Sequence, residues 1–380
     1  MIHAKRLAAF VMLPSAVLAS GCEQRASQAP EPANLPAFYA HIAEALPPEI
    51  EKRHLELEAA LAEAAAAEAA GDDGFGTSAS VIIKDYRRWA PGSTVTVAFP
   101  ASTSVSPAEL QVWAEIERLA KEWTGANAAD LILQFRNPDG SFRTWSTTDS
   151  AHAADIRITF AGRGYWSGIG RFSSEPRVFR ANEPSMSLAG FVTNRPPNWQ
   201  RVVRHEFGHA LGFMHEHQNA NIDCRFRYQD DPGYVPTLSP RRAYIPDTSG
   251  RRPGLIRWFS GYPNFWDEAK VRANLGPIGT TSIYTPDDFV HTAYDPRSIM
   301  KYFFEPEFFQ NGRQSPCYGD EATALSADDR STAKSAYEGA IERRLASFEL
   351  VRRAPALPAD VKRGAADEIA LTKSLGAAGD

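Results

Sequence analysis

Residues 205–215 read HEFGHALGFMH and hold three histidines. His205 and His209 are four residues apart, so on a helix both imidazoles lie on one face, one turn apart, where a single tetrahedral Zn²⁺ can accept both. Glu206 lies about 100° further round that helix and can reach a water molecule beside the metal without being a ligand itself. The pattern predicts that the helix over residues 201–213 carries a metal site.

Gly212 gives the chain a way to leave this helix, because glycine adopts positive φ without penalty. The turn then brings His215 back as a third ligand. Three neutral nitrogens leave the fourth position of a zinc ion open, which is the catalytic rather than the structural arrangement. The alternative is an amphipathic core helix whose histidines are incidental.

The composition is that of an ordinary globular protein, with 43% hydrophobic and 23% charged residues in a chain of 380. This length accommodates one large domain or two small ones. The net charge of −5 is small for the size and indicates no polyanion-binding surface. Nucleic acid is therefore not expected as a partner.

The N-terminus has the features of a secretory signal. Lys5 and Arg6 precede an apolar run at 7–18 that is too short to span a bilayer, and small residues follow at 19–21. Cys22 comes directly after them, which resembles a bacterial lipoprotein signal, in which that cysteine is lipidated and becomes the new N-terminus. The resemblance implies export and a lipid anchor at the membrane, with the outer membrane favoured. The alternative is an ordinary signal and a secreted protein.

Two cysteines remain, Cys224 and Cys317. An even pair in an exported chain is interpreted first as a disulfide, which would join the segment after the metal helix to a segment near the C-terminus. Ligation of the metal by cysteine is the less favoured alternative, because three histidines already fill the protein positions of a catalytic site.

Composition divides the chain into four parts. Residues 1–22 form the signal, 23–79 a tether and an Ala/Glu-rich helical stalk or pro-segment, 80–350 the catalytic domain, and 351–380 a polar tail. The helical stretch at 57–70 contains little apolar material beyond alanine, so a solvated and loosely packed stalk is expected. A pro-segment that covers the active site is the alternative. The tail is expected to pack weakly if at all.

The catalytic domain is predicted to be α+β. Before the metal helix the pattern is strand, helix, strand, strand, which predicts a twisted sheet backed by a helix. The expected strands lie at 80–84, 93–99, 131–135 and 155–160, and the expected helices at 107–124, 265–275 and 326–350, with Ser106 as the N-cap of the first.

The strand near residues 154–160 is followed by glycines at 162, 164, 168 and 170. An exposed edge strand here could hold a substrate, because an extended peptide adds to its free N–H and C=O groups. The alternative is an interior strand followed by a flexible loop.

At this point the chain resembles the metzincin zinc endopeptidases, and within them the astacin type. The matching residues are His205, Glu206, His209, Gly212, Phe213, His215, Glu216, Ser298, Met300 and Tyr302, and more weakly Leu325, Ser326, Asp329 and Tyr337. The resemblance implies a twisted mixed sheet with two long helices above an irregular C-terminal subdomain, and an active-site cleft between them. It also implies that Met300 lies in the turn beneath the zinc and that Tyr302 is a fifth ligand that swings away to stabilise the oxyanion.

The expected activity is hydrolysis of internal peptide bonds by a zinc-activated water, with Glu206 as general base. The expected cofactor is one zinc ion, and the expected partners are a peptide or protein substrate and the membrane lipid. Two other functions fit the same residues: a zinc amidase acting on cell-wall peptides, and a non-catalytic peptide-binding surface lipoprotein. The sequence does not indicate an oligomeric state.

Overall fold

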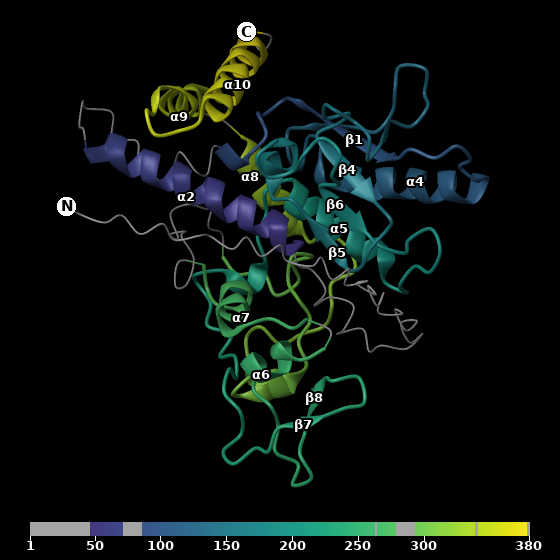
Figure 1. Cartoon of the computed structure of the whole chain (residues 1–380), viewed down its shortest axis with the longest axis vertical. Coiled ribbons are helices and arrows are strands. Elements are labelled where there is room, and N and C mark those ends of the chain that lie inside the picture. Colours follow the sequence, from purple (N-terminus) through teal and green to yellow (C-terminus); the bar gives the residue numbers. More distant parts are fainter. Residues whose placement is uncertain (1–45, 71–85, 263, 279–292, 339–340, 378–380) are drawn as a thin grey trace, which may run out of the picture. The chain divides into compact units, whose positions relative to one another are not determined.

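The computed structural model describes residues 46–70, 86–262, 264–278, 293–338 and 341–377 (Figure 1). The predicted signal with Cys22, most of the predicted tether, and the predicted strand at 80–84 lie outside these residues. The structure combines helices with a mixed β-sheet, which confirms the α+β class.

The main sheet has the strand order β2, β1, β4, β6, β5, with β3 paired to the far end of β1. Neighbouring strands run parallel except β5, which is antiparallel to β6. The strands are β1 (Thr94–Pro100), β2 (Ile132–Gln134), β3 (Thr144–Trp145), β4 (Ile156–Thr159), β5 (Tyr165–Ser167) and β6 (Met186–Leu188). The predicted strands at 93–99, 131–135 and 155–160 are confirmed.

Helices α4 (Pro107–Ala120) and α5 (Trp199–Ala210) share one hydrophobic core with the sheet. Alternate residues of β1, β4 and β6 enter it, as the twofold repeat of a strand requires. From the sheet these are Val95, Val97, Phe99, Ile156, Ile158, Met186 and Leu188. Helix α4 begins at a capping box formed by Ser106 and Glu109, as expected for that N-cap. The sheet and α4 thus provide a rigid base for α5.

The predicted substrate strand is an interior strand. β4 pairs with β1 on one side and β6 on the other, so its backbone groups are already used. The expectation of an exposed edge at this place is wrong. The edge strand on this side of the sheet is β5, which arises within the glycine-rich stretch that follows, and it contacts α5.

The part of the chain after α5 is largely irregular and has its own aromatic core. Its regular elements are short, and they are β7 (Thr237–Leu238), β8 (Tyr244–Ile245), α6 (Leu255–Ser260) and α7 (Glu268–Leu275). This part also contains the short 3₁₀ helices η3 (Glu216–Gln218), η5 (Pro306–Phe308) and η6 (Gly312–Gln314). Two others, η1 (Lys121–Trp123) and η2 (Gly170–Ser174), precede α5. The helix predicted at 265–275 is α7.

The predicted helix at 326–350 is two helices, α8 (Ala327–Tyr337) and α9 (Ile341–Arg353). Helix α8 ends at Tyr337 with Glu338 as its C-cap, and the sequence has Gly339 next, a residue of low helix propensity. Helix α8 joins the main core, and the Tyr337 hydroxyl donates to the Leu211 carbonyl at 2.8 Å. Among the described helices, none combines the length and apolar character needed to cross a membrane.

Helix α2 (Pro48–Ala70) is packed, so the expectation of a solvated stalk is wrong for this stretch. Leu57 and Leu61 are 5% and 1% exposed. With Ile50, His54 and Ala64 they form a buried stripe that repeats every three or four residues along one face. The expectation weighed apolar content, whereas the spacing of a few apolar residues decides whether a helix packs.

The predicted polar tail is also ordered. It contains α10 (Ala359–Ala377), which packs against α9 and buries Val361 and Ala365. Helices α2, α9 and α10 build a second hydrophobic core together with Tyr86, Trp166, Phe172 and Phe179. Segments from both ends of the chain therefore meet in one core.

A buried ion pair ties α2 to this core. The Arg87 Nε donates to Glu58 Oε1 at 2.9 Å, and His54 Nε2 lies 3.1 Å from the same oxygen. Glu58 is 0% and Arg87 is 4% exposed. Burial alone would raise the pKa of Glu58, but the charges and hydrogen bonds of Arg87 and His54 outweigh it and hold that pKa below its usual 4.5.

We predict that Glu58→Gln lowers the free energy of unfolding at about pH 7 by roughly 3–5 kcal/mol, because Arg87 keeps a buried charge without its counter-charge. The wild-type contribution is present above the unfolded-state pKa and fades as pH falls below 4.5, because the folded-state pKa is the lower one. Urea denaturation as a function of pH measures both effects, and the variant should lose less stability than wild type on acidification.

The matched control is Glu56→Gln on the same helix. Glu56 is 64% exposed, and the 3.8 Å between its Oε1 and Lys52 Nζ is long for an ion pair. This change should therefore shift stability by less than about 0.5 kcal/mol. Equal effects of the two substitutions would contradict the role given to the buried pair.

Candidate metal centre

Helix α5 carries two of the three histidines. His205 is 0% and His209 is 6% exposed, and neither belongs to the hydrophobic core that other residues of α5 share with the sheet. Their rings are 4.8 Å apart between centroids. Glu206, between them in sequence, is fully buried. The helix thus delivers two imidazoles and one carboxylate to the same region.

The turn after α5 is the sharp reversal that Gly212 was expected to make. Gly212 has a φ of +93°. The Phe213 amide donates to the Gly208 carbonyl at 3.0 Å, and the Gly212 amide donates to the His209 carbonyl at 2.8 Å. This pair of bonds is a Schellman motif with glycine at its left-handed position. A Cβ at Gly212 would meet nothing within 4 Å, so the backbone conformation and not space requires glycine here.

The turn places His215 beside the two helical histidines. One ring nitrogen from each of the three lies within 4.8 Å of the others. The Nε2 atoms of His209 and His215 are 3.1 Å apart, close to the roughly 3.3 Å between two ligands of a tetrahedral zinc with 2.0–2.1 Å bonds. The three-histidine group fits one zinc ion.

The opposite nitrogen of each ring is held by a hydrogen-bond acceptor. His205 Nδ1 lies 2.8 Å from the Ile299 carbonyl, and His209 Nδ1 lies 2.7 Å from the Phe213 carbonyl. His215 Nδ1 lies 3.1 Å from Oε1 of Gln218. Carbonyl oxygens only accept, so these contacts place the proton on Nδ1 and leave the Nε2 lone pair for a metal.

Met300 lies under α5 in the turn that was expected beneath the metal. Its sulfur is 2.3 Å from where a Cβ on Gly208 would lie, so only glycine lets the turn approach the helix this closely. The Met300 carbonyl accepts from the Glu216 amide at 3.1 Å. The same turn supplies the Ile299 carbonyl to His205. It therefore contacts the segments of two histidines.

Asp329 fixes the shape of this turn. Its carboxylate accepts from the Ser298 hydroxyl at 2.7 Å and from the Ile299 amide at 2.9 Å. It also closes the capping box of α8 with Ser326. Burial raises the pKa of Asp329, although these hydrogen bonds act to lower it.

Tyr302 lies beside the histidines. Its ring centroid is 4.2 Å from that of His215 and 5.8 Å from that of His205, and the residue is 2% exposed. His217, 4.8 Å from the same ring, is buried and its Nε2 lies 3.0 Å from the Asn274 carbonyl. Within the described residues the metal-ligating group contains His205, His209 and His215 but not His217.

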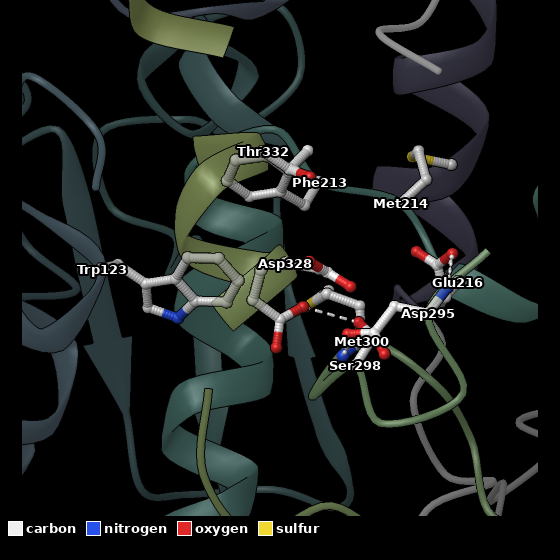
Figure 2. Close-up of a pocket in the computed structure, with 10 residues that line it drawn as sticks. Trp123, Phe213, Met214, Glu216, Asp295, Ser298, Met300, Asp328 and Thr332 are labelled. Carbon is white, nitrogen blue, oxygen red and sulfur yellow. Dashed lines mark hydrogen bonds between the residues drawn. The ribbon is translucent and has the colours of Figure 1, made fainter. Parts of the chain in front are cut away.

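An acidic pocket lies next to the centre (Figure 2). Glu216 Oε1 accepts from the Asp295 amide at 3.0 Å and from the Asn219 side chain at 3.1 Å. Burial raises the pKa of Glu216 to about 7, and the nearby carboxylates of Asp329 and Asp295 add to this. The clustering of these acids depends on segments far apart in the chain, so local sequence patterns do not indicate Asp295.

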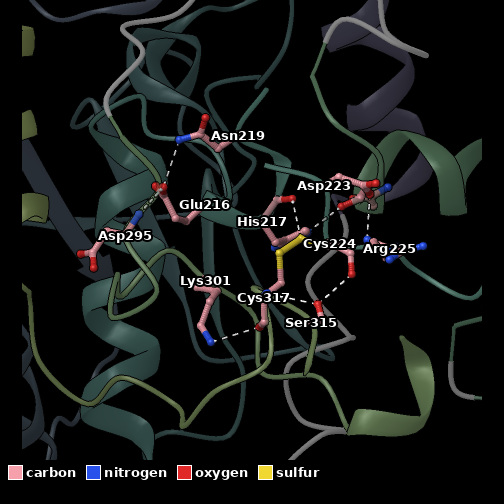
Figure 3. Close-up of a disulfide and its surroundings, with 11 residues drawn as sticks. Glu216, His217, Asn219, Asp223, Cys224, Arg225, Asp295, Lys301, Ser315 and Cys317 are labelled. Carbon is pink, nitrogen blue, oxygen red and sulfur yellow. Dashed lines mark hydrogen bonds between the residues drawn. A yellow bond between two sulfur atoms is a disulfide. The ribbon is translucent and has the colours of Figure 1, made fainter. Parts of the chain in front are cut away.

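Cys224 and Cys317 form a disulfide (Figure 3). The Ser315 hydroxyl donates to the Cys224 carbonyl at 2.8 Å, and Lys301 Nζ donates to the Cys317 carbonyl at 3.4 Å. Burial lowers the pKa of the Lys301 amine. The bond joins the segment after η3 to the segment after Tyr302, two neighbours of the metal centre.

Comparisons with known proteins give structural similarity only. No protein-family model matches the chain, and no curated protein matches it. Two solved structures of myroilysin are each 25% identical to this chain, and each match spans 67% of this chain. The matches span 97% and 86% of the two myroilysin chains, with TM-scores of 0.47 and 0.38. A hatching enzyme zinc-protease from the medaka fish Oryzias latipes is 17% identical, with 66% of this chain and 92% of that one covered and a TM-score of 0.33. At these TM-scores the function has to be argued from the site.

We predict that Gly208→Ala lowers the free energy of unfolding by about 1–3 kcal/mol, because the new methyl group would press on Met300 and also lie 2.9 Å from the buried Trp123 ring. Thermal unfolding measures this. Gly364→Ala is the control, because nothing lies within 4 Å of a Cβ there, and the added helix propensity in α10 should raise stability by up to about 1 kcal/mol. A stable Gly208→Ala protein would show that the helix and the turn are not in close contact.

Proposed function

We propose that this protein is a zinc-dependent endopeptidase. The observation that carries the proposal is the three-histidine group, in which every Nδ1 faces an acceptor, together with a fully buried glutamate directly after the first histidine. A site that only bound metal would not need Glu206. The carboxylate therefore favours a hydrolase over a non-catalytic binder.

His205, His209 and His215 would hold the metal. Zinc, when bound, acts as a Lewis acid and lowers the pKa of water to about 7. Glu206 accepts the proton of the attacking water and later delivers it to the leaving amine of the peptide.

Tyr302 is proposed to donate its hydroxyl proton in a hydrogen bond to the carbonyl oxygen as negative charge develops there. Its position beside His215 supports this. Met300 has a positioning role: it fills the space beneath Gly208 and holds the turn that contacts His205.

The substrate is proposed to lie along β5. This strand is the edge of the sheet on the side of α5, and its own partner β6 runs antiparallel to it. An extended peptide can add to an edge strand through main-chain hydrogen bonds, which gives affinity with little dependence on sequence. An internal peptide bond would then pass the histidines on α5.

We further propose that the protein is exported and anchored through Cys22. The Cys224–Cys317 disulfide supports export, because such bonds persist in oxidising compartments. Labelling with radioactive palmitate in a bacterial host would test the anchor, and a protein that carries no label, or an equally labelled Cys22→Ser variant, would exclude it.

The test of activity is purified protein incubated with a mixed peptide library, with and without a zinc chelator, and analysed by mass spectrometry. We expect cleavage at internal bonds that stops with the chelator and returns with added zinc. Cleavage that persists in chelator, or a library left intact by zinc-loaded protein, would contradict the proposal.

Glu206→Gln is predicted to retain zinc and to lower kcat by about 10²–10⁴-fold, because the amide cannot take a proton from water. Metal content by atomic spectroscopy and peptide turnover measure the two parts. Tyr302→Phe should also retain zinc and lower kcat with KM little changed, since its hydrogen bond strengthens only as charge develops. A Glu206→Gln protein that cleaves at the wild-type rate would remove Glu206 from the mechanism; Glu56→Gln is the control.

A further inference from the structure

The third histidine depends on a side chain that the proposed mechanism does not use. Gln218 Oε1 lies 3.1 Å from His215 Nδ1, and its Nε2 donates to the Ala273 carbonyl at 2.8 Å and to the Gly276 carbonyl at 3.4 Å. We propose that Gln218 positions His215 for metal binding, and that helix α2 stabilises this arrangement from outside the site by holding α7. The proposal rests on the metal centre of the proposed function.

The two carbonyls of α7 decide which way the Gln218 amide faces. A carbonyl oxygen can only accept, so the NH₂ group must point to Ala273 and Gly276, and the amide oxygen must point to His215. That oxygen in turn requires a proton on Nδ1 of His215. The Nε2 of His215 is then the nitrogen with a lone pair, and it faces His209 Nε2. Backbone geometry in α7 thus selects the metal-binding tautomer of the third ligand.

Carbonyl groups at the C-terminal end of α7 accept hydrogen bonds from side chains of η3. The usual partner of the Ala273 carbonyl would be the amide four residues later, but that residue is Pro277, which has no N–H. Gln218 takes its place. The next carbonyl, that of Asn274, accepts from His217, and the Ile278 amide donates to the Gln218 carbonyl at 2.9 Å. Helix α7 and η3 therefore satisfy each other's backbone groups.

Helix α7 is itself tied to α2. Lys270 Nζ lies 2.5 Å from Glu51 Oε2, and the two side chains are 20% and 31% exposed. Glu51 is in the first turn of α2, which is fastened further along by Arg53 to Glu183 and by Glu58 to Arg87. Figure 1 shows α2 passing next to α7, which belongs to the irregular part of the chain. A continuous path of polar contacts runs from α2 through α7 and Gln218 to His215.

The first experiment measures zinc affinity by competition with a chelator, using the full chain. Gln218→Leu, close in size but unable to accept a hydrogen bond, should weaken zinc binding by about 10–100-fold, as loss of such a partner does at other metal sites. It should also alter the visible absorption spectrum of the Co²⁺-substituted protein. A Gln218→Leu protein with wild-type affinity and an unchanged Co²⁺ spectrum would overturn the positioning role, whatever its thermal stability.

The second experiment tests the link to α2. Glu51→Ala and Lys270→Ala should each weaken zinc binding by about 2–5-fold, the range for a partly exposed ion pair, and the double variant should be no weaker than either single one. Glu56→Ala removes an exposed carboxylate from the same helix, 3.8 Å from Lys52, and it should leave the affinity unchanged. If Glu51→Ala behaves like Glu56→Ala, the link to α2 is wrong.

A third measurement needs no variant. Long-range ¹H–¹⁵N correlation spectra of metal-free protein with labelled histidine should show His215 as the Nδ1–H tautomer near neutral pH, and the opposite tautomer would overturn the argument. These outcomes are separable from the proposed activity. Wild-type protein that binds zinc but cleaves no peptide would exclude the peptidase while leaving the role of Gln218 intact. If the wild-type protein cleaves peptides and Gln218→Leu binds zinc as wild type does, the role of Gln218 is excluded and the peptidase proposal stands.

Discussion

The metal centre depends on one constraint: every imidazole must donate a hydrogen bond from Nδ1–H to a fixed acceptor, so that the lone pair of its Nε2 is available to a metal. The three acceptors come from three different places, the turn at Ile299, the helix end at Phe213 and the side chain of Gln218. Each is held by further contacts, such as the carboxylate of Asp329 on the Ile299 amide. The histidine motif supplies the ligands, whereas the remainder of the fold sets their protonation and direction.

The α+β class and the elements around the site follow from local patterns. The 3.6-residue period and the N-cap at Ser106 predict α4, and valine-rich runs predict β1. The metal motif predicts both a helix and the turn after it, from the spacing of His205, His209, Gly212 and His215. Only a reversal of the chain at Gly212 brings the third histidine beside the other two. These predictions succeed because the interactions concerned span only a few residues.

Other parts of the structure depend on contacts between distant segments, and there the sequence was insufficient. β4 becomes an interior strand only because β6 pairs with it, and β5, between Gly164 and Gly168, is too short to be recognised from its sequence. Gln218 looked like an ordinary polar residue because its partners lie on α7, more than fifty residues later. Helix α2 was expected to be solvated because it has few apolar residues. Its leucines are buried because α9, α10 and the region of Phe172 cover them, and the local sequence does not reveal these distant partners.

The second core, made by helices from both ends of the chain, also orders events during synthesis. Leu57 and Leu61 emerge early from the ribosome, but the residues that cover them, such as Phe348 and Val361, come almost three hundred positions later. Contacts with such long sequence separation form late and slowly. During synthesis, the nascent chain would expose the buried stripe of α2 and would need a chaperone to cover it. A product shortened at its C-terminus would keep that stripe exposed and would be a target for quality-control degradation.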